Sequence, residues 1–303
     1  MKGLLKKLDP YYRLGRYDKP IGGWLVFWPS AYGIVLASPG TLMDPFIYGS
    51  VFASCFLLRS AHCAINDFWD RNLDKHVERT KTRPLASGEL SVPQGLAFFT
   101  SQMVPIPIMW YLVGSNAAWV VPTTIPILTL YPLAKRFLPW PQTILGIAMN
   151  WNILLYHAIL TNSVPLYIWP LYTGLWCWTM IYDSIYAFQD LKDDLKVGNN
   201  STAVAWQEKY EKYCDAFAMG MGANMLLGGY LAGLGPMYYP MMGISVAHAM
   251  YTYKSLDTSS TKDCWNKFSM HQYTGILMFI AFILGKVKFD SNKDQEKVLE
   301  IVS

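Results

Sequence analysis

The sequence predicts an all-α membrane protein, a bundle of nine transmembrane helices. Hydrophobic residues make up 52% of the 303 positions and charged residues only 15%, whereas a soluble domain carries about 25% charged residues. The charges are clustered, and long apolar stretches of the kind that cross a bilayer separate the clusters. This distribution excludes a soluble fold. The modest formal charge of +4 gives no reason to expect a nucleic-acid partner.

Nine candidate spans follow one another along the chain. Some are short or contain proline, which a helix bundle tolerates because neighbouring helices satisfy the freed backbone groups. The expected spans are Gly22–Ser38, Pro45–Ile65, Val92–Val113, Ala117–Leu133, Pro141–Leu160, Pro165–Phe188, Cys214–Leu234, Pro236–Tyr253 and Met270–Lys286.

The placement of positive charge tests this count of nine spans. The N-terminal segment and the loops after the second, fourth, sixth and eighth spans together hold 20 of the 25 lysines and arginines, and the alternate loops hold none. The remaining five are Arg59, inside the second span, and four lysines near the C-terminus. By the positive-inside rule the charged loops are cytoplasmic. A different number of spans would have mixed the two kinds of loop.

The chain is expected to form one domain over residues 1–303, with a membrane bundle over 21–290 and a polar tail over 291–303. The N-terminal segment is basic but has no apolar signal-peptide core and no Arg/Ser-rich presequence, so we expect no cleaved leader. Five scattered cysteines without a Cys-x-x-Cys pair indicate reduced packing residues. Acidic segments end the second and the sixth spans, which suggests two related halves that face each other.

These two acidic segments carry the first candidate site. The first reads NDFWDRNLD over 66–74, and its aspartates at i, i+3 and i+7 would share one helical face about 10 Å long. The second reads DLKDD over 190–194, with two of its aspartates at i and i+4. The aspartates of interest are Asp67, Asp70, Asp74, Asp190 and Asp194.

Carboxylates at this spacing predict a bound cation. They repel each other, and at a membrane boundary desolvation adds to the cost. Magnesium fits because it prefers oxygen ligands and binds one or two carboxylates together with phosphate oxygens. The alternative is a solvated loop face neutralised by Arg71, Lys75 and Lys192. Two clusters on the same side favour magnesium around one diphosphate.

Basic residues on the same side would complete a diphosphate site, because a departing diphosphate needs cations as its charge develops. Positive-inside topology alone would also place such residues there. Arg59 differs, since an arginine inside an apolar span is a functional hypothesis by default; alternatively it only pairs with an acid between two helices. The basic residues on the acidic side are Arg79, Lys81, Arg83, Lys135 and Arg136.

Aromatic residues make up 15% of the chain. Interfacial belts and core packing account for much of this content. Several rings nevertheless lie close to the motifs in sequence, and their faces would stabilise an allylic carbocation. These are Tyr131, Trp151, Tyr156, Tyr182 and Tyr186.

Four stretches in order carry a resemblance to a known family. They are RYDKPIG at 16–22; LLRSAHCAINDFWDRNLDKHVERTKTRPLASG at 57–88; YP at 131–132 with KR at 135–136 and PQ at 141–142; and YDSIYAFQDLKDDLKVGNNSTA at 182–203. Together they resemble the UbiA superfamily of intramembrane prenyltransferases over nearly the whole chain, closest to the 4-hydroxybenzoate polyprenyltransferase group.

The resemblance implies a bundle of nine helices around a cavity with a cytoplasm-side cap. It also implies Mg²⁺ as cofactor, an isoprenyl diphosphate and a phenolic acid as substrates, and no required protein partner. Asn66 joins the aspartates above as a ligand of the metal and diphosphate, and Asp190 and Asp70 are the catalytic candidates. The expected diphosphate ligands are Lys135, Arg136, Arg79 and Lys192. The expected acceptor contacts are Arg16, Lys19 and Arg71, together with His62 and Asn150, where the sequence departs from its relatives.

Leu138 is a third departure from the family pattern. Because all three residues could line the acceptor pocket, they favour an acceptor other than 4-hydroxybenzoate. We expect magnesium-dependent transfer of a farnesyl-type group to the ring carbon of a hydroxylated aromatic acid in meroterpenoid biosynthesis, in the endoplasmic reticulum. The alternative is the 4-hydroxybenzoate polyprenyltransferase of ubiquinone biosynthesis, in a mitochondrial inner or bacterial plasma membrane. Alternatives of other kinds are a transporter and a UbiA-type terpene cyclase.

Overall fold

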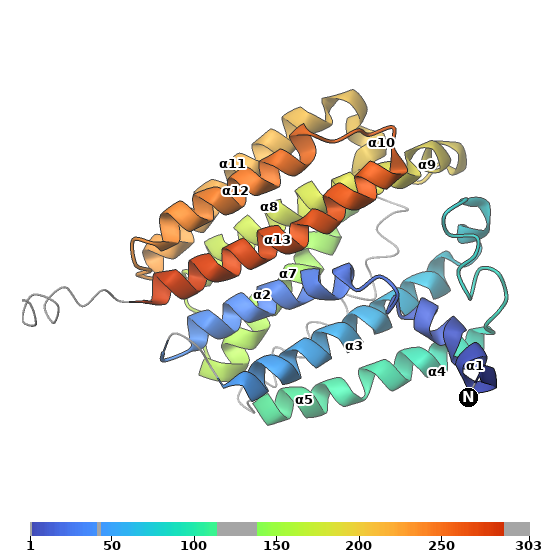
Figure 1. Cartoon of the computed structure of the whole chain (residues 1–303), viewed down its shortest axis with the longest axis horizontal. Helices are drawn as coiled ribbons and strands as arrows, with labels where there is room; N and C mark the ends of the chain where they lie inside the picture. Colours follow the sequence, from blue (N-terminus) through green and yellow to red (C-terminus); the bar gives the residue numbers. More distant parts are fainter. Residues whose placement is uncertain (1, 41–43, 114–137, 288–303) are drawn as a thin grey trace, which may run out of the picture.

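The computed structural model describes residues 2–40, 44–113 and 138–287, and within them the regular structure is entirely helical. Figure 1 shows a bundle of long helices with smaller elements gathered at one end. The expectation of an all-α bundle is confirmed. The helices are α1 (Lys2–Leu14), α2 (Ile21–Ala37), α3 (Pro45–Asp70), α4 (Val92–Met103), α5 (Pro105–Val113), α7 (Gln142–Thr161), α8 (Ile168–Ala187), α9 (Leu191–Val197), α10 (Thr202–Trp206), α11 (Tyr210–Leu231), α12 (Tyr238–Lys254) and α13 (Thr261–Lys286), with short 3₁₀ turns η1 (Asp74–His76), η2 (Phe188–Asp190) and η3 (Gln207–Lys209).

Each expected span within the described residues is occupied by helix. The span over 92–113 is divided into α4 and α5, because Pro105 has no amide hydrogen with which to continue the helical hydrogen bonds. The span expected at 117–133 lies outside the described residues. The helix α13 begins nine residues earlier than expected, where the Ser260 side chain accepts a hydrogen bond from the Asp263 amide and caps it.

The core lies where two groups of helices meet. One group contains α2, α3, α4, α5 and α7 and the other α8, α11, α12 and α13; α2 packs on α7 and α13, and α8 packs on α7, α11 and α13. At the contact of α2 with α7, a β-carbon added to Gly33 would lie 2.6 Å from the Ile153 carbonyl oxygen. Only glycine allows the two backbones to approach this closely.

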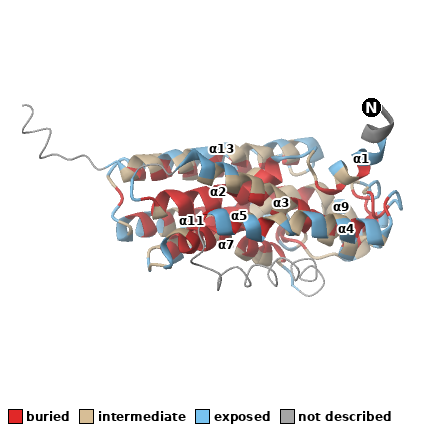
Figure 2. Ribbon diagram, turned by 90° about the horizontal axis from the view of Figure 1, so that it is seen from below, coloured by how far each residue is buried: buried red, intermediate tan, exposed pale blue. Residues whose placement is uncertain are grey.

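The outer surface of the bundle is apolar. Among the exposed side chains, Tyr111 on α5 is 72% accessible, Met219 on α11 is 70% and Tyr230 is 74%. By length and composition, α4 with α5, α7 and α13 are each apolar enough to cross a membrane. Buried residues fill the interior, while exposed ones lie on the outer helices (Figure 2). Exposed apolar groups of this size indicate a lipid-facing surface, and the membrane character of the chain is confirmed.

The small elements cap one end of the bundle. They are α1, the loop over residues 71–91 that contains η1, and the segment from α9 to α10, and they lie together in Figure 1. The helix α1 falls in a segment for which no helix was expected, and Leu14 at its end is fully buried against Leu85 and Leu90 of the loop. Arg16 follows with φ 58°, a left-handed conformation that turns the chain toward α2.

Candidate active site at the capped end of the bundle

The first acidic cluster is positioned by the end of α3. Asn66, Asp67 and Asp70 lie in its last turns, but the helix stops at Asp70 and Asp74 belongs to the separate turn η1. The expectation of one helical face over all three aspartates is therefore wrong beyond Asp70. Asp74 returns to the site because Arg83 binds it and Asp67 together, at 2.9 and 3.1 Å.

The second acidic cluster is positioned by the end of α8. A 3₁₀ turn, η2, separates α8 from α9, and Asp190 closes this turn with φ −107° and ψ 0°. The expected continuous helix through Asp190 and Asp194 is thus interrupted. Both carboxylates still line the same cavity, and α9 ends at Gly198 in a left-handed conformation.

A cavity lies between the two clusters. It encloses about 1050 Å³ of empty space, counting the open solvent at its mouth. Its polar lining combines Arg16, Arg59, His62, Asn66, Asp67, Arg79, Arg83, Gln142, Asp183, Asp190, Asp194 and Asn199. Its apolar and aromatic lining combines Gly22, Leu25, Leu145, Met149, Tyr182, Tyr186 and Phe268. A smaller adjoining hollow is lined by Asp70 and Asp74 and shares Arg79, Arg83, Asp190, Asp194 and Asn199 with the cavity.

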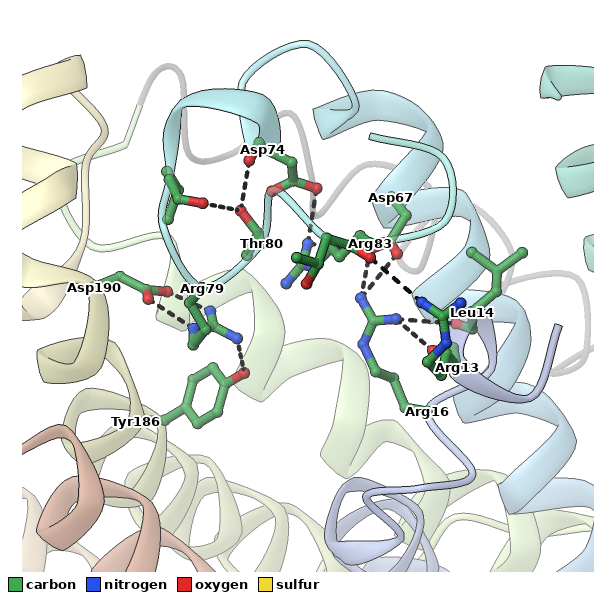
Figure 3. A network of polar contacts seen from close by, with 12 residues as sticks. Arg13, Leu14, Arg16, Asp67, Asp74, Arg79, Thr80, Arg83, Tyr186 and Asp190 are labelled. Carbon is green, nitrogen blue, oxygen red and sulfur yellow. Dashed lines mark hydrogen bonds and ion pairs between the residues drawn. The ribbon is translucent and has the colours of Figure 1, made fainter. Parts of the chain in front are cut away.

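Arginines bind the carboxylates on one side of the site (Figure 3). Arg16 donates to both oxygens of Asp67 at 2.8 Å, and Arg83 donates to one of them. Asp67 is only 1% exposed, so its charge is satisfied entirely by these two guanidinium groups among the contacts described. Burial opposes the charge of Arg16, but Asp67 outweighs this effect and raises the pKa of the arginine above its ordinary value.

On the other side, Arg79 binds Asp190 through two nitrogens (Figure 3). A third nitrogen of Arg79 donates to the Tyr186 hydroxyl at 2.8 Å, and the guanidinium lies 5.1 Å from the centre of that ring. Burial disfavours the charge of Arg79, yet Tyr186 and Asp190 raise its pKa above the ordinary value. The loop over 71–91 is therefore fixed to α8 by a permanently charged group.

Further contacts hold the cap over the cavity. The amide of Glu78 donates to Asp193 of α9 at 3.1 Å. Arg13 of α1 binds Glu89 at 2.5 Å and Asp9 at 2.8 Å. These contacts join the parts of the cap to one another, whereas Arg79 and Arg83 join the cap to α8 and α3.

Most of the predicted site residues meet at the two adjoining hollows. Those that line one or both are Asn66, Asp67, Asp70, Asp74, Asp190, Asp194, Arg79, Arg16 and His62. Lys135 and Arg136 lie outside the described residues.

Four predicted residues line neither hollow. Lys192 is exposed on α9. Lys19 lies 5.6 Å from the centre of the Trp265 ring. Arg71 turns back onto its own helix, where it donates to the Phe68 carbonyl at 2.7 Å and lies 4.9 Å from that ring. Asn150 is buried in the core and donates to Gly146 and Thr179, at 2.7 Å each.

The structure adds residues to the site that the motifs did not single out. Gln142 lines the cavity and accepts a hydrogen bond from the Thr202 amide at 3.1 Å, which ties α7 to α10. Asn199 follows Gly198 and donates to Asp194 at 3.3 Å. Both residues fall within stretches that carry the family resemblance, and the glycine after an acidic helix is a second signal for Asn199, because glycine commonly ends helices and lets the chain turn back.

The side chains at the cavity would hold magnesium only together with further ligands from a bound substrate. Among the described residues, no three His, Cys, Asp or Glu side chains lie close enough to hold a metal ion by themselves. The oxygen donors at the cavity are of the type that Mg²⁺ prefers, and Mg²⁺ commonly takes remaining ligands from substrate phosphates. The residues therefore fit a metal that binds together with a diphosphate.

The fold and this site define an intramembrane prenyltransferase, and the chain belongs to the UbiA prenyltransferase family, which it matches over residues 26–283. It is 37% identical to the mitochondrial 4-hydroxybenzoate polyprenyltransferase of Mus musculus, over 97% of this chain and 80% of that protein. It is 36% identical to 4-hydroxybenzoate geranyltransferase 1 of Lithospermum erythrorhizon, over 94% and 92% of the two chains. The relatives are thus aromatic prenyltransferases, the class of enzyme that the sequence predicts.

Solved structures of the family share the fold. A UbiA homolog from Aeropyrum pernix K1 superposes with a TM-score of 0.71 at 21% identity, over 86% of this chain and 97% of that one. A UbiA homolog from Archaeoglobus fulgidus, bound to GPP and Mg²⁺, superposes with a TM-score of 0.69 at 16% identity, over 90% and 99%. The family assignment confirms the predicted resemblance and class, and it disfavours the transporter alternative.

Proposed function

We propose that this protein transfers a prenyl group from its diphosphate to the ring carbon of 4-hydroxybenzoate, in a reaction that requires Mg²⁺. The observation that carries the proposal is the cavity between the two acidic clusters, which is polar and arginine-rich at the cap and apolar and aromatic toward the bundle. A diphosphate suits the first region and an isoprenoid chain the second. The names of the relatives supply the acceptor.

This proposal replaces the meroterpenoid expectation with its alternative. The relatives above act, by their names, on 4-hydroxybenzoate, and they use both polyprenyl and geranyl donors. Two of the residues that had favoured another acceptor, Asn150 and Leu138, do not line the cavity. We infer that the donor lies in the range from geranyl to polyprenyl diphosphate and is not restricted to farnesyl diphosphate.

Five residues of the two hollows would hold Mg²⁺ together with the diphosphate. When bound, the metal would neutralise negative charge on the diphosphate oxygens as the leaving group departs. Asp190 and Asp194 line both hollows, whereas Asp67 is enclosed by two arginines. We therefore propose that Asp67 anchors the cap rather than binding metal. The proposed ligands are Asn66, Asp70, Asp74, Asp190 and Asp194.

Arg79 and Arg83 would bind the diphosphate itself. Both line the cavity and the smaller hollow, and both already lie against carboxylates that the metal would occupy. With those carboxylates turned to a bound metal, the two guanidinium groups would pair with diphosphate oxygens, for which their planar fork is well suited.

Arg59 is proposed to bind the carboxylate of the acceptor. It lines the cavity from α3, two turns before Asn66 and so further from the cap. A β-carbon on Gly22 would lie 2.4 Å from its Nε atom, so the glycine of α2 makes room for the arginine. From this position Arg59 would bind the carboxylate of an aromatic acid that lies deeper in the cavity than the diphosphate.

The residues then support the following reaction. The bond between the allylic carbon and its diphosphate oxygen breaks, and the electron pair leaves with the diphosphate toward Arg79 and Arg83. The ring carbon ortho to the phenol donates an electron pair to the allylic carbon, and the ring proton passes to a carboxylate, for which Asp190 is the candidate, or to the departing diphosphate. The apolar side of the cavity keeps water from the cation.

Purified protein in detergent would test the proposal. It is incubated with Mg²⁺, geranyl or farnesyl diphosphate, and either 4-hydroxybenzoate, orsellinic acid or no acceptor, with Asp190→Asn as the inactive control. A prenylated 4-hydroxybenzoate detected by mass spectrometry would support it. Product from orsellinic acid alone would restore the meroterpenoid assignment, and a terpene formed without acceptor would indicate a cyclase.

The same relatives bear on location. The mitochondrial label in the names of the animal enzymes supports a mitochondrial membrane over the endoplasmic reticulum. We propose the mitochondrial location, to be tested by imaging the tagged natural protein against markers for both compartments. A signal that follows the endoplasmic reticulum marker would contradict it.

A further inference from the structure

A histidine and a tryptophan are buried together behind the aromatic wall of the cavity. The wall consists of Tyr182 and Tyr186 of α8 and Phe268 of α13, which line the cavity. Behind it lie Trp178, one turn before Tyr182, and His271, three residues after Phe268; both are 0% exposed and neither lines the cavity. The reaction proposed above assigns no role to this pair.

The hydrogen bonds of the pair define the state of His271. The indole nitrogen of Trp178 can only donate, and it lies 2.9 Å from Nδ1 of His271, which therefore accepts. The proton of a neutral imidazole is then on Nε2, 3.0 Å from the Thr252 hydroxyl oxygen. That hydroxyl donates onward to the Ala249 carbonyl at 2.6 Å. One chain of hydrogen bonds thus joins α8, α13 and α12 in a single tautomer.

The paired rings contact the wall directly. Trp178 lies 5.2 Å from Tyr182, centre to centre, with their planes at 78°, and His271 lies 5.6 Å from the same ring. Phe268 is 6.1 Å from Tyr182 and 4.8 Å from Tyr186. The Tyr182 hydroxyl is 3.0 Å from the Thr179 hydroxyl oxygen and 3.5 Å from the Met149 sulfur. Tyr182 is therefore fixed at its hydroxyl and supported from behind by two rings.

We propose that Trp178 and His271 are positioning residues, which hold the face of Tyr182, and through it that of Phe268, toward the allylic cation. Packing alone does not require this pair, because apolar side chains would fill the same space without burying polar nitrogens. A buried pair with fixed hydrogen bonds instead sets the angle of each ring, and cation–π attraction depends on the face that a ring presents. This inference rests on the proposed prenyl transfer.

The effect expected is a change in the fate of the cation rather than in substrate binding. Without the hydrogen bond, the indole and Tyr182 are free to tilt, the cation is less stabilised, and water competes with the acceptor ring. In His271→Leu we expect kcat to fall about tenfold, or about 1.4 kcal/mol. The ratio of prenol to prenylated product should rise several-fold, with the KM of donor and acceptor unchanged.

Two amide variants separate positioning from packing. An asparagine oxygen can replace Nδ1 as the acceptor for Trp178, whereas a glutamine reaches toward Thr252 and loses the bond to the indole. We expect His271→Asn to retain most of the wild-type product ratio and His271→Gln to resemble His271→Leu. Thr252→Val is the matched control, because it removes the far hydrogen bond and leaves the pair intact.

The experiment measures steady-state kcat and KM and the product ratio of the detergent-purified protein with geranyl diphosphate, 4-hydroxybenzoate and Mg²⁺, together with a melting curve for each variant. Equal product ratios in all variants, or losses of kcat that simply follow the melting temperatures, would reduce the pair to a structural role and overturn the inference. A wild-type protein that forms no prenylated aromatic would overturn the proposed function itself. If His271→Leu does not fold, the asparagine and glutamine variants decide alone.

Discussion

The variant Asp67→Asn tests whether Asp67 anchors the cap, as we propose, or binds the metal. Asp67 accepts three hydrogen bonds from Arg16 and Arg83, at 2.8, 2.8 and 3.1 Å, and is 1% exposed. The amide keeps the shape of the carboxylate but removes its charge. If Asp67 anchors the cap, the variant should lose stability and keep its magnesium dependence.

The size of the loss follows from burial. The side chains of Arg16 and Arg83 are 18% and 16% exposed, so both cations are largely withdrawn from solvent. Removing one partner of a buried ion pair costs about 3–5 kcal/mol. Because Arg83 retains Asp74 at 2.9 Å, we expect the lower end, about 3 kcal/mol. In a chain of this size that corresponds to a fall in melting temperature of roughly 5 °C.

The stability is measured by thermal unfolding in detergent. A thiol-reactive dye monitors the unfolding, because the cysteines are buried in the folded protein. A magnesium titration of the initial rate measures metal binding. Asp9→Asn is the matched control, since Asp9 pairs with Arg13 in an exposed position; it should lower the melting temperature by no more than about 2 °C. A wild-type melting temperature in Asp67→Asn, with a magnesium requirement raised tenfold, would refute the anchor and make Asp67 a metal ligand.

Four further predictions follow from the site and the bundle. Asp190→Asn should lower kcat by at least about a thousandfold, since it removes a proposed metal ligand and the candidate base, and it should leave the fold intact by circular dichroism. Treatment with EDTA should abolish turnover and added Mg²⁺ should restore it, whereas turnover that persists in EDTA would exclude the metal. Arg59→Gln should raise the KM for 4-hydroxybenzoate about tenfold or more and leave that of the donor unchanged, because a charge-assisted contact contributes about 1.5–3 kcal/mol; equal effects on both would contradict the assignment. Gly33→Ala should destabilise the contact with Ile153 by about 1–3 kcal/mol, while Gly49→Ala, which meets nothing within 4 Å, should not lower the melting temperature.

The apolar spans and the acidic clusters were predictable from the sequence because both are local patterns. A stretch of apolar residues long enough to cross a bilayer has few alternatives to a helix, since its backbone groups find no partners in lipid. Helix α2 begins and ends within one residue of the predicted span. The two acidic motifs each end a predicted span, and the structure brings both to one cavity.

Predictions from residue spacing fail beyond the point where a helix ends. The spacing of the aspartates placed Asp74 on the face of α3, but the helix ends at Asp70 and a side-chain contact with Arg83 returns Asp74 to the site. Arg71, only four positions after Asp67, instead turns back onto Phe68 and lines neither hollow. Spacing in sequence therefore did not decide which side chains face the cavity.

The sequence by itself determined that this protein is a helical membrane protein, where its spans lie and which residue types gather at one side of the membrane. Only the tertiary structure decided which partners meet. Arg16 binds Asp67 from 51 positions away, Arg79 binds Asp190 from 111, and Trp178 binds His271 from 93. Such pairs depend on how the helices pack and turn about their axes, and this packing is set by close contacts such as that of Gly33 with Ile153, which no local pattern records.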